Sequence, residues 1–383
     1  MPTFFSHLEC SVPCGAGPYD PRQAHAVCTI CGAPLVARYD LTGAKRWPKS
    51  SLAGREASQW RYREILPLLE SDKGLDQPVT LGEGWTPLLR ARRLGKALGL
   101  DRIYVKDESQ NPGGSCKARG VSAAVTRALH VGARGVSATS HGHGGVAIAA
   151  YASRAGLDAT LSLPKETRRS FVRACELAGA TVTQDGTAPP AGTIDLSAYR
   201  EPYRLEGTKT LGYEIVEQLG WTLPDWIICP AGSGLTITAM WKALSEIAAL
   251  GWIDAVRRPR LACAQAAGCA PLVRAFGAGE DKASAWDEAQ TIADGLRVPS
   301  TIGDVLALRA LRESGGAAVA AGDAEMIAGM KDLGRYEGLS ASPEGGATLH
   351  ALRVLIGEGR VKTNDTVVLV NTSGAVYDLD VLG

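Results

Sequence analysis

The sequence predicts an α/β fold with two three-layer α/β domains, preceded by a small cysteine-rich module. Apolar runs at Val136–Thr139 and Trp226–Cys229 each lead through a Gly-rich turn into a helical stretch. Strand–turn–helix units repeated along a chain favour parallel sheets covered by helices on both faces. The length of 383 residues suggests two or three domains and is enough to bury a sizeable core.

Composition and charge exclude several classes of function. The chain carries 41 Lys and Arg against 40 Asp and Glu, which gives a net charge of +1. We therefore expect neither nucleic acid nor an anionic membrane as a partner. The N-terminus shows no basic stretch followed by an apolar one, and no apolar run reaches transmembrane length. We expect a cytoplasmic protein whose nine cysteines are reduced thiols, metal ligands or both.

Four cysteines in two close pairs open the chain. Cys10 and Cys14 form the first pair, Cys28 and Cys31 form the second, and a glycine follows each pair. Four thiolates at this spacing can surround one tetrahedral Zn²⁺, which stabilises a module too small to fold on its core alone. The spacing therefore predicts a zinc-ribbon-like module over residues 1–41. The alternative is a ribbon whose cysteines no longer bind metal, and the few basic residues in the module argue against nucleic-acid binding.

A connector follows the module and contains one helix-like patch, Trp60–Leu69. The next segment, Leu81–Leu88, contains two glycines and a proline. We therefore expect it to form a fixed turn, which includes Thr86.

A lysine at an unusual position marks the centre of the sequence. The run Ile103–Glu108 predicts a strand and Val121–Leu129 a helix, and the Pro/Gly loop between them ends at Lys117. Cations are disfavoured at the positive N-terminal end of a helix. A lysine in such a field loses its proton more readily, which suits an amine that forms a Schiff base. The simpler interpretation is an exposed lysine in the first helical turn.

Two Gly-rich turns each link a predicted strand to a predicted helix. The first of these helices begins near Val146 and the second near Ile237. Bare backbone N–H groups at a helix N-terminus bind anions. The second turn lacks the Gly-Lys-[Ser/Thr] of a nucleotide-binding P-loop. The first turn consists of Ser140, His141, Gly142, His143 and Gly144, and the second of Gly232, Ser233, Gly234, Leu235 and Thr236.

Four more strands and a helix complete the alternating pattern. We expect strands at 160–164, 181–182, 261–265 and 366–370, and a helix over 172–177. The last strand ends in the polar sequence Asn-Thr-Ser-Gly, in which the hydroxyl residues are Thr372 and Ser373.

The motifs together resemble the threonine synthases and their relatives, the fold-type II enzymes that depend on pyridoxal 5′-phosphate (PLP). The segment Asn111–Gly120 is similar to the PLP-lysine motif of that family, and Glu206–Thr210 is similar to its Glu-Gly-x-Lys-Thr motif. The turn Leu81–Leu88 is similar to its Gly-Glu-Gly-x-Thr-Pro-Leu motif. One subgroup of threonine synthases also has a cysteine-rich leader, so the resemblance runs from Cys10 to Gly374.

The resemblance implies roles for these segments. Lys117 would carry PLP and then move protons, while the turn from Ser140 to Gly144 would hold the substrate carboxylate. The second Gly-rich turn would bind the PLP phosphate. Thr372, with Ser373 as the second choice, would face the pyridine nitrogen.

The same resemblance places Thr86 and Lys209 among the substrate-binding residues. Lys209 lies in the Glu-Gly-x-Lys-Thr motif, which is usual in threonine synthases and unusual in dehydratases. An additional cation suits a substrate that carries its own phosphate.

His143 is the main departure from the family pattern, which has Asn at that position beside the 3′-oxygen of PLP. A neutral imidazole can donate one hydrogen bond, as an amide does. It can also charge near neutral pH and move protons. We therefore predict that His143 binds the cofactor, where it keeps the electronic properties of PLP, alters them, or acts beside Lys117 as an additional acid or base. A metal site at His141 and His143 is disfavoured because no carboxylate lies nearby in sequence. Cys116 is a second departure from the family pattern, which usually has an aromatic residue at that position.

The resemblance implies conversion of O-phosphohomoserine and water to threonine and phosphate. It implies a large PLP-binding α/β domain over 42–120 and 205–383, a smaller α/β domain over 121–204, and PLP in the cleft between them. A homodimer is the default for soluble oligomers. His143 keeps open β-elimination or β-replacement on a serine- or phosphoserine-like substrate. A PLP- or metal-binding protein without turnover is the alternative of another class, and Lys117 with the phosphate loop argues against it.

Overall fold

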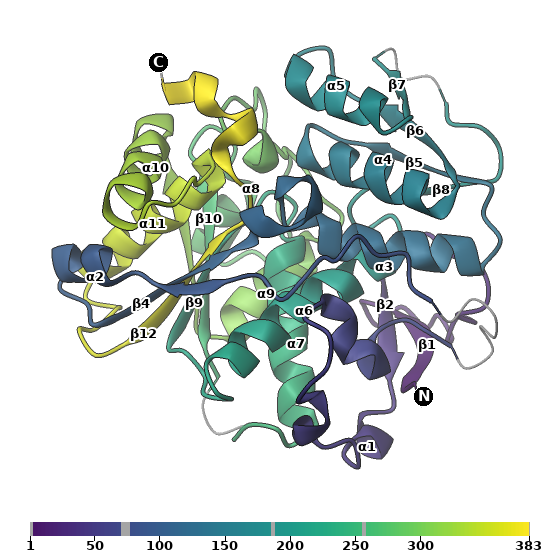
Figure 1. Cartoon of the computed structure of the whole chain (residues 1–383), viewed down its shortest axis with the longest axis horizontal. Coiled ribbons are helices and arrows are strands. Elements are labelled where there is room, and N and C mark those ends of the chain that lie inside the picture. Colours follow the sequence, from purple (N-terminus) through teal and green to yellow (C-terminus); the bar gives the residue numbers. More distant parts are fainter. Residues whose placement is uncertain (1–2, 70–76, 185–187, 255–257, 383) are drawn as a thin grey trace.

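Two sheets and a short N-terminal strand pair organise the chain (Figure 1). The computed structural model describes residues 3–69, 77–184, 188–254 and 258–382. Strands and helices alternate along most of this length, which confirms the predicted α/β fold.

The larger sheet has six strands, all parallel except one antiparallel edge strand. In sheet order they are β11 (Ala317–Ala321), β10 (Arg260–Ala266), β9 (Trp226–Pro230), β12 (Thr366–Asn371), β4 (Arg102–Asp107) and the antiparallel β3 (Leu88–Arg90). Successive residues of its central strands enter opposite cores: Ile227 and Val368 pack on one side, and Ile228 and Leu369 on the other. Both faces are therefore covered, which explains why these strands are continuous apolar runs.

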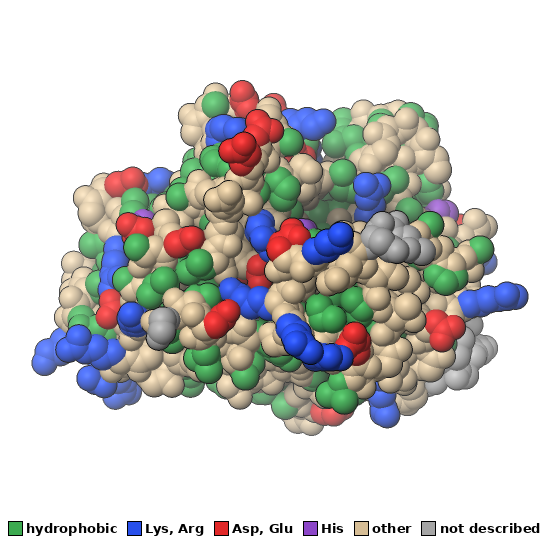
Figure 2. Space-filling model, turned by 90° about the horizontal axis from the view of Figure 1, so that it is seen from above, with side chains coloured by type: hydrophobic (Ala, Val, Ile, Leu, Met, Phe, Trp, Pro, Cys, Tyr) green, Lys and Arg blue, Asp and Glu red, His purple; other side chains and the backbone are tan. Residues whose placement is uncertain are grey.

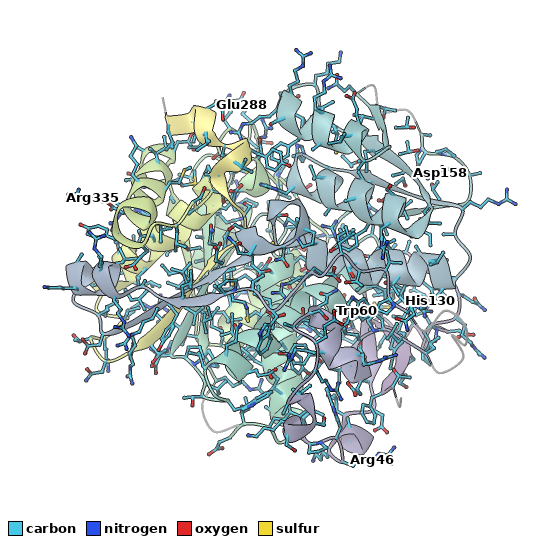
Figure 3. All side chains as sticks on the ribbon, viewed as in Figure 1. Arg46, Trp60, His130, Asp158, Glu288 and Arg335 are labelled. Atoms are coloured by element: carbon cyan, nitrogen blue, oxygen red, sulfur yellow. The ribbon has the colours of Figure 1, made fainter. Side chains whose placement is uncertain are left out.

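The smaller sheet has four parallel strands, all from residues 135–195. Their order is β7 (Thr181–Thr183), β6 (Asp158–Ser162), β5 (Gly135–Thr139) and β8 (Thr193–Asp195). This sheet lies inside the predicted smaller domain, 121–204, whose exact bounds stay a prediction. Asp158, which begins β6, lies near the outer edge of this unit in Figure 3.

Helices join and cover the two sheets. The helix α3 packs against both α4 and α6, and α6 packs against α7, so these helices connect the two sheet units. The helices are α1 (Leu41–Ala44), α2 (Arg92–Leu98), α3 (Lys117–His130), α4 (His143–Ala155), α5 (Arg169–Leu177), α6 (Tyr203–Gln218), α7 (Leu235–Ala249), α8 (Pro271–Gly277), α9 (Asp304–Glu313), α10 (Asp323–Glu337) and α11 (Pro343–Gly357). Short 3₁₀ turns are η1 (Lys49–Leu52), η2 (Gln59–Ile65), η3 (Glu108–Gln110), η4 (Pro112–Gly114), η5 (Asp294–Leu296), η6 (Ala375–Tyr377) and η7 (Leu379–Leu382).

The connector differs from its prediction in one detail. The expected helix-like patch at Trp60–Leu69 is the 3₁₀ turn η2, with a kink at Tyr62. Side-chain hydrogen bonds hold this turn in place. The buried Trp60, for example, donates from Nε1 to Glu83 Oε1 at 2.8 Å. Figure 3 shows Trp60 well inside the outline of the molecule. The end of the connector, residues 70–76, lies outside the described residues.

The N-terminal module contains β1 (Phe5–Cys10) paired antiparallel with β2 (Leu35–Tyr39). Its apolar side chains share a core with α3 and α4. On the surface, acidic and basic side chains are interspersed on the face shown in Figure 2, in line with the net charge of +1. No helix in the described parts of the chain is long and apolar enough to cross a membrane.

Candidate active site

Loops at the carboxyl ends of four parallel strands meet at one cavity of about 240 Å³. They follow β4, β5, β9 and β12, and ligands of open α/β sheets bind at such strand ends. The cavity brings together most of the predicted site. Of the predicted residues, its lining includes Lys117, the turn 140–144, the loop 232–236, Thr372 and Ser373.

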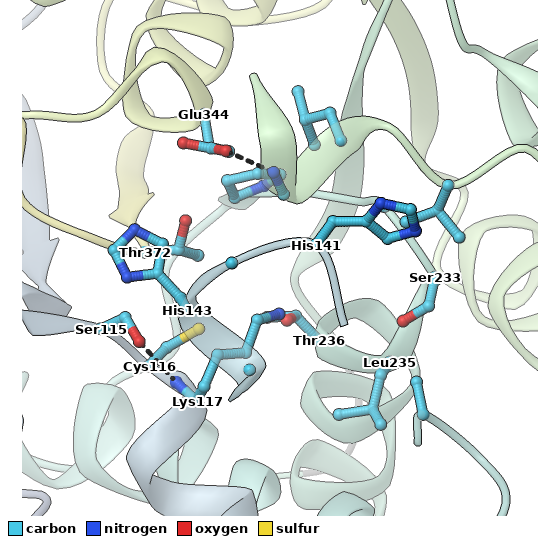
Figure 4. Close-up of a pocket in the computed structure, with 18 of the residues that line it drawn as sticks. Ser115, Cys116, Lys117, His141, His143, Ser233, Leu235, Thr236, Glu344 and Thr372 are labelled. Carbon is cyan, nitrogen blue, oxygen red and sulfur yellow. Dashed lines mark hydrogen bonds between the residues drawn. The ribbon is translucent and has the colours of Figure 1, made fainter. Parts of the chain in front are cut away.

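Lys117 is the first residue of α3, as the sequence predicts. The loop before it is tied to the C-terminal loop, because Cys116 N–H donates to the Thr372 carbonyl at 2.8 Å and Gly374 N–H donates to the Gly114 carbonyl at 3.1 Å. In Figure 4 the Lys117 side chain extends across the cavity toward Thr236. Within the described ranges, no residue forms a hydrogen bond or ion pair with its Nζ. Its amine is therefore available to a bound molecule.

The loop after β9 has the shape of an anion cradle. It ends at the N-terminus of the 15-residue helix α7, and no backbone N–H from Gly232 to Thr236 donates a hydrogen bond to another described residue. Glycine is required here by close approach, since a Cβ on Gly232 would lie 2.2 Å from the Gly295 carbonyl oxygen. Gly234 adopts a φ of +78°, a backbone angle that residues other than glycine rarely adopt. These features fit the phosphate of PLP.

The turn after β5 forms a second anion site at the start of α4. Ser140 Oγ accepts hydrogen bonds from Gly145 N–H at 2.8 Å and Gly142 N–H at 3.4 Å, which fixes the turn. The backbone N–H groups of His143 and Gly144, in the first turn of α4, have no partner among the residues that the structure describes. A carboxylate can therefore accept from both.

Arg204 is a cavity residue that the sequence analysis did not assign to the site. It lies near the start of α6, is 8% exposed, and donates from Nη1 to the Leu196 carbonyl at 2.7 Å. A Cβ on Gly144 would lie 3.9 Å from its Nη2, so the guanidinium lies beside the second anion site. The sequence signal was its place immediately before Leu205-Glu206-Gly207.

Two predicted substrate residues lie elsewhere. Lys209 is fully buried in α6, where it forms ion pairs at 2.8 Å with Glu206 and with Glu246 of α7, and burial lowers its pKa. Thr86 is 3% exposed and donates from Oγ1 to Glu108 Oε1 at 2.6 Å. Neither residue lines the cavity, so the structure does not bring them to the other predicted site residues.

His143 is half-buried, and both of its ring nitrogens are shielded from solvent. Neither nitrogen has a well-oriented hydrogen-bond partner among the described residues. Burial lowers the pKa of His143 to about 4, so the imidazole is neutral at physiological pH. Figure 4 places its ring beside Thr372 in the cavity. His141 also lines the cavity, and burial lowers its pKa as well.

The two candidate hydroxyl residues after β12 differ in availability. Ser373 Oγ donates to Ser342 Oγ at 2.9 Å, at the start of α11. Thr372 lines the same cavity, and its hydroxyl has no hydrogen-bond partner among the residues described. This difference favours Thr372 for contact with a bound ring, as the sequence analysis expected.

Glu344 is a second cavity residue that the sequence analysis missed. It is 5% exposed, and its Oε1 accepts from Gly295 N–H at 2.8 Å. Figure 4 shows it on the side of the cavity opposite Lys117. Glu344 belongs to the segment Pro343–Ala347, which begins α11. The sequence analysis assigned no role to the side chains of this segment.

The four N-terminal cysteines converge in space. The Sγ atoms of Cys10, Cys14, Cys28 and Cys31 all lie within 4.8 Å of one another, and three of the separations are 3.5 Å. Four sulfurs around Zn²⁺ at about 2.3 Å lie about 3.8 Å apart, so this arrangement fits a tetrahedral zinc site. Tyr19 O–H donates to Cys28 Sγ at 3.3 Å and lowers the pKa of Cys28 to about 6.

Comparison with known proteins identifies the family of the chain. Residues 79–373 match the family described as "Pyridoxal-phosphate dependent enzyme". The chain is 33% identical to the threonine synthase of Methanosarcina acetivorans, over 97% of this chain and 92% of that protein. It is 37% identical to the threonine synthase of Mycobacterium tuberculosis, over 83% of this chain and 88% of that protein.

Solved structures show the same fold at lower identity. The L-serine ammonia-lyase of Rhizomucor miehei superposes with a TM-score of 0.67 at 21% identity, over 78% of this chain and 96% of that one. Maize serine racemase gives a TM-score of 0.65 at 22% identity, over 78% and 90% of the two chains. These likenesses confirm the fold-type II architecture. The chain therefore belongs to the pyridoxal-phosphate dependent enzyme family and, within it, to the threonine synthases.

Proposed function

We propose that the protein converts O-phosphohomoserine and water to threonine and phosphate. The observation that carries this proposal is one cavity lined by an available lysine amine and by two turns that can each bind an anion, with the guanidinium of Arg204 beside one of them. One anion site suits the phosphate of PLP, and the other suits the substrate carboxylate. The guanidinium of Arg204 provides for a further anion on the substrate.

The residues of the cavity fit PLP. When bound, PLP supplies an electron sink that stabilises negative charge at the substrate carbons. Lys117 would attach it, the loop 232–236 would hold its phosphate, and Thr372 would face its ring nitrogen. An uncharged hydroxyl at that point leaves the ring nitrogen largely unprotonated, whereas an acid would strengthen the electron sink. His143, neutral at physiological pH, would donate one hydrogen bond to the 3′-oxygen.

The remaining steps belong to the residues of this chain. The N–H groups of the 140–144 turn hold the carboxylate, so that Cα faces the Lys117 amine. Lys117 then removes the proton at Cα and moves protons between Cα and Cβ. Phosphate leaves from Cγ, where Arg204 stabilises its charge, and water adds at Cβ.

We expect Arg204→Gln to raise the KM for O-phosphohomoserine by about 10- to 100-fold, the value of one or two charge-assisted hydrogen bonds. The Ki of inorganic phosphate should rise in parallel. Steady-state kinetics with phosphate inhibition measures both constants. Arg200→Gln, which changes an exposed arginine four residues earlier, is the matched control and should leave both unchanged. If Arg204→Gln raised the KM for serine as much as the KM for O-phosphohomoserine, the assignment of Arg204 to the phosphate would be wrong.

His143 favours a second candidate, β-elimination or β-replacement on a serine- or phosphoserine-like substrate, because it occupies the position of the family's asparagine. The products separate the two reactions. Threonine and phosphate in equal amounts support threonine synthase, whereas ammonia with a keto acid supports a dehydratase. A binding protein without turnover would release neither set.

We further propose that the four cysteines hold one structural Zn²⁺ and that the protein acts in the cytoplasm as a homodimer. The Sγ separations support the zinc site, and two-fold dimers are the commonest soluble oligomers. Elemental analysis should find one zinc per chain. Cys31→Ser, which changes an exposed side chain, should abolish zinc binding and lower the thermal midpoint, because metal binding supplies the stability of such a module.

Ile30→Ser is the matched control for the zinc site, since Ile30 is 64% exposed and directly precedes Cys31. It should keep the full zinc content. Wild-type protein purified from zinc-containing medium without any bound metal would contradict the site.

A further inference from the structure

The C-terminal segment after β12 places an aromatic ring against His143, which lines the cavity. This segment consists of η6 and η7, and it carries Tyr377. The Tyr377 ring stacks on Phe171 of α5, with centroids 4.7 Å apart and an interplanar angle of 24°. Phe171 is 1% exposed. The segment therefore packs through Tyr377 on a helix of the smaller sheet unit.

The stacked pair holds the imidazole of His143. The His143 ring meets Phe171 edge-on at 4.9 Å and Tyr377 edge-on at 5.4 Å, with interplanar angles of 72° and 84°. Edge-to-face aromatic contacts at these distances are favourable. Because neither ring nitrogen has a well-oriented hydrogen-bond partner among the described residues, these two aromatic contacts contribute to the orientation of the ring. Phe171 also presses on the preceding turn, since a Cβ on Gly142 would lie 3.0 Å from its ring.

An ionic cluster anchors the segment that carries Tyr377. Arg168, immediately before α5, pairs with Asp378 and, at 3.2 Å, with Asp294 of η5. Its Nη2 also donates to the Ile292 carbonyl at 2.9 Å. Asp378 is 3% exposed, so the pair with Arg168 is shielded from water. One arginine thus ties together α5, the loop beside the cavity and the C-terminal segment.

We propose that Tyr377, with Phe171, is a positioning residue that fixes the His143 imidazole toward the bound cofactor, and that the Arg168–Asp378 pair holds Tyr377 in place. This inference rests on the proposed function, in which His143 faces PLP. The tyrosine hydroxyl has no part in it, because Tyr377 contacts Phe171 and His143 through its aromatic ring. Tyr377 thus acts on the active site through His143, without lining the cavity itself.

A double-mutant cycle without substrate tests this inference. The variants are Tyr377→Leu, Tyr377→Phe, His143→Asn and the double variant Tyr377→Leu/His143→Asn, and the readouts are the PLP absorbance band, the Kd for PLP and the thermal midpoint. Tyr377→Leu should alter the band and raise the Kd by about 3- to 10-fold, the value of lost aromatic contacts. Tyr377→Phe should restore wild-type values. In the His143→Asn background, Tyr377→Leu should add little, because the residue that it positions is gone.

Two further variants control for the folding of the segment. Val376→Ala changes a neighbouring side chain that is 68% exposed and should match the wild type. Arg168→Gln should reproduce the Tyr377→Leu result. An unchanged band and Kd in Tyr377→Leu, or an equal effect in the His143→Asn background, would overturn the inference. Since no substrate is used, failure of the wild type to make threonine would overturn the proposed function and leave this result intact.

Discussion

Replacing Lys117 with alanine should abolish the PLP absorbance band and lower turnover by at least about 10³-fold, because in the proposed mechanism this one residue both attaches the cofactor and moves the protons. No other lysine lines the cavity among the described residues, so none can substitute for it. The band is read from the spectrum of the purified variant after incubation with PLP. Turnover is read as release of phosphate from O-phosphohomoserine.

Lys165→Ala is the matched control for this prediction, because Lys165 is an exposed lysine of the smaller sheet unit. It should keep the wild-type band and rate. A Lys117→Ala variant that retains the band would show that PLP is attached elsewhere, and the central assignment would fail.

Arg119→Met should lower the free energy of unfolding by about 3–5 kcal/mol, the usual result of removing one partner from a buried ion pair. Arg119 donates to Glu108 Oε2 and to Glu214 Oε1, both at 2.5 Å, and Lys106 pairs with Glu214 at 2.9 Å. All four side chains are fully buried. Without Arg119, two carboxylates share one cation away from water. Denaturant unfolding of the full chain measures the loss.

The matched control is Arg173→Met, which removes an arginine that is 64% exposed and paired with Glu176 on the surface of α5. Its cost should stay within about 1 kcal/mol, as for other exposed pairs. Equal losses in the two variants would contradict the role of the buried network.

The same network gives stability a defined acid dependence. Burial opposes the ionisation of Glu214, but Arg119 and Lys106 outweigh it and lower its pKa from 4.5 to about 2. A lowered carboxylate pKa contributes stability that is present above the ordinary value and lost as the pH falls through the folded value. The wild type should therefore lose stability between about pH 4.5 and pH 2, and Arg119→Met should lose less over that range because the favourable charge partner is already absent.

Local sequence signals were enough for seven of the ten strands in the two larger sheets and for the two Gly-rich loops that line the cavity. The turn from Ser140 to Gly144 and the loop from Gly232 to Thr236 both lie at the cavity, because a Gly-rich turn between a strand and a helix must expose backbone N–H groups at the sheet edge. The start of α3 at Lys117 followed from its Pro/Gly loop. In each case the residues that decide the structure are neighbours in sequence.

The choice between Lys209 and Arg204 could not be made in the same way. Both belong to α6, which is buried on every side from Tyr203 to Val216, so its sequence has no solvent face that sets the helix orientation. Packing against α3 and α7 decides that Arg204 reaches the cavity while Lys209 pairs with acids in the core. That information comes from other elements and not from α6.

The packing of Phe171 and Tyr377 against His143 could not be predicted from the local sequence either. Its three rings come from α4, α5 and the C-terminal segment, so Phe171 and Tyr377 meet across more than 200 residues. The helical spacing of Phe171 and Cys175 places both on the buried side of α5, but it does not say which ring Phe171 contacts.

Turnover of O-phosphohomoserine in ¹⁸O-labelled water tests the central claim most directly. Loss of phosphate from Cγ followed by addition of water at Cβ breaks a carbon–oxygen bond and places solvent oxygen on the new hydroxyl. The account therefore predicts one ¹⁸O atom in threonine and none in the released phosphate, with the two products in equal amounts and both absent in Lys117→Ala. Labelled phosphate with homoserine, or release of ammonia and a keto acid, would contradict it.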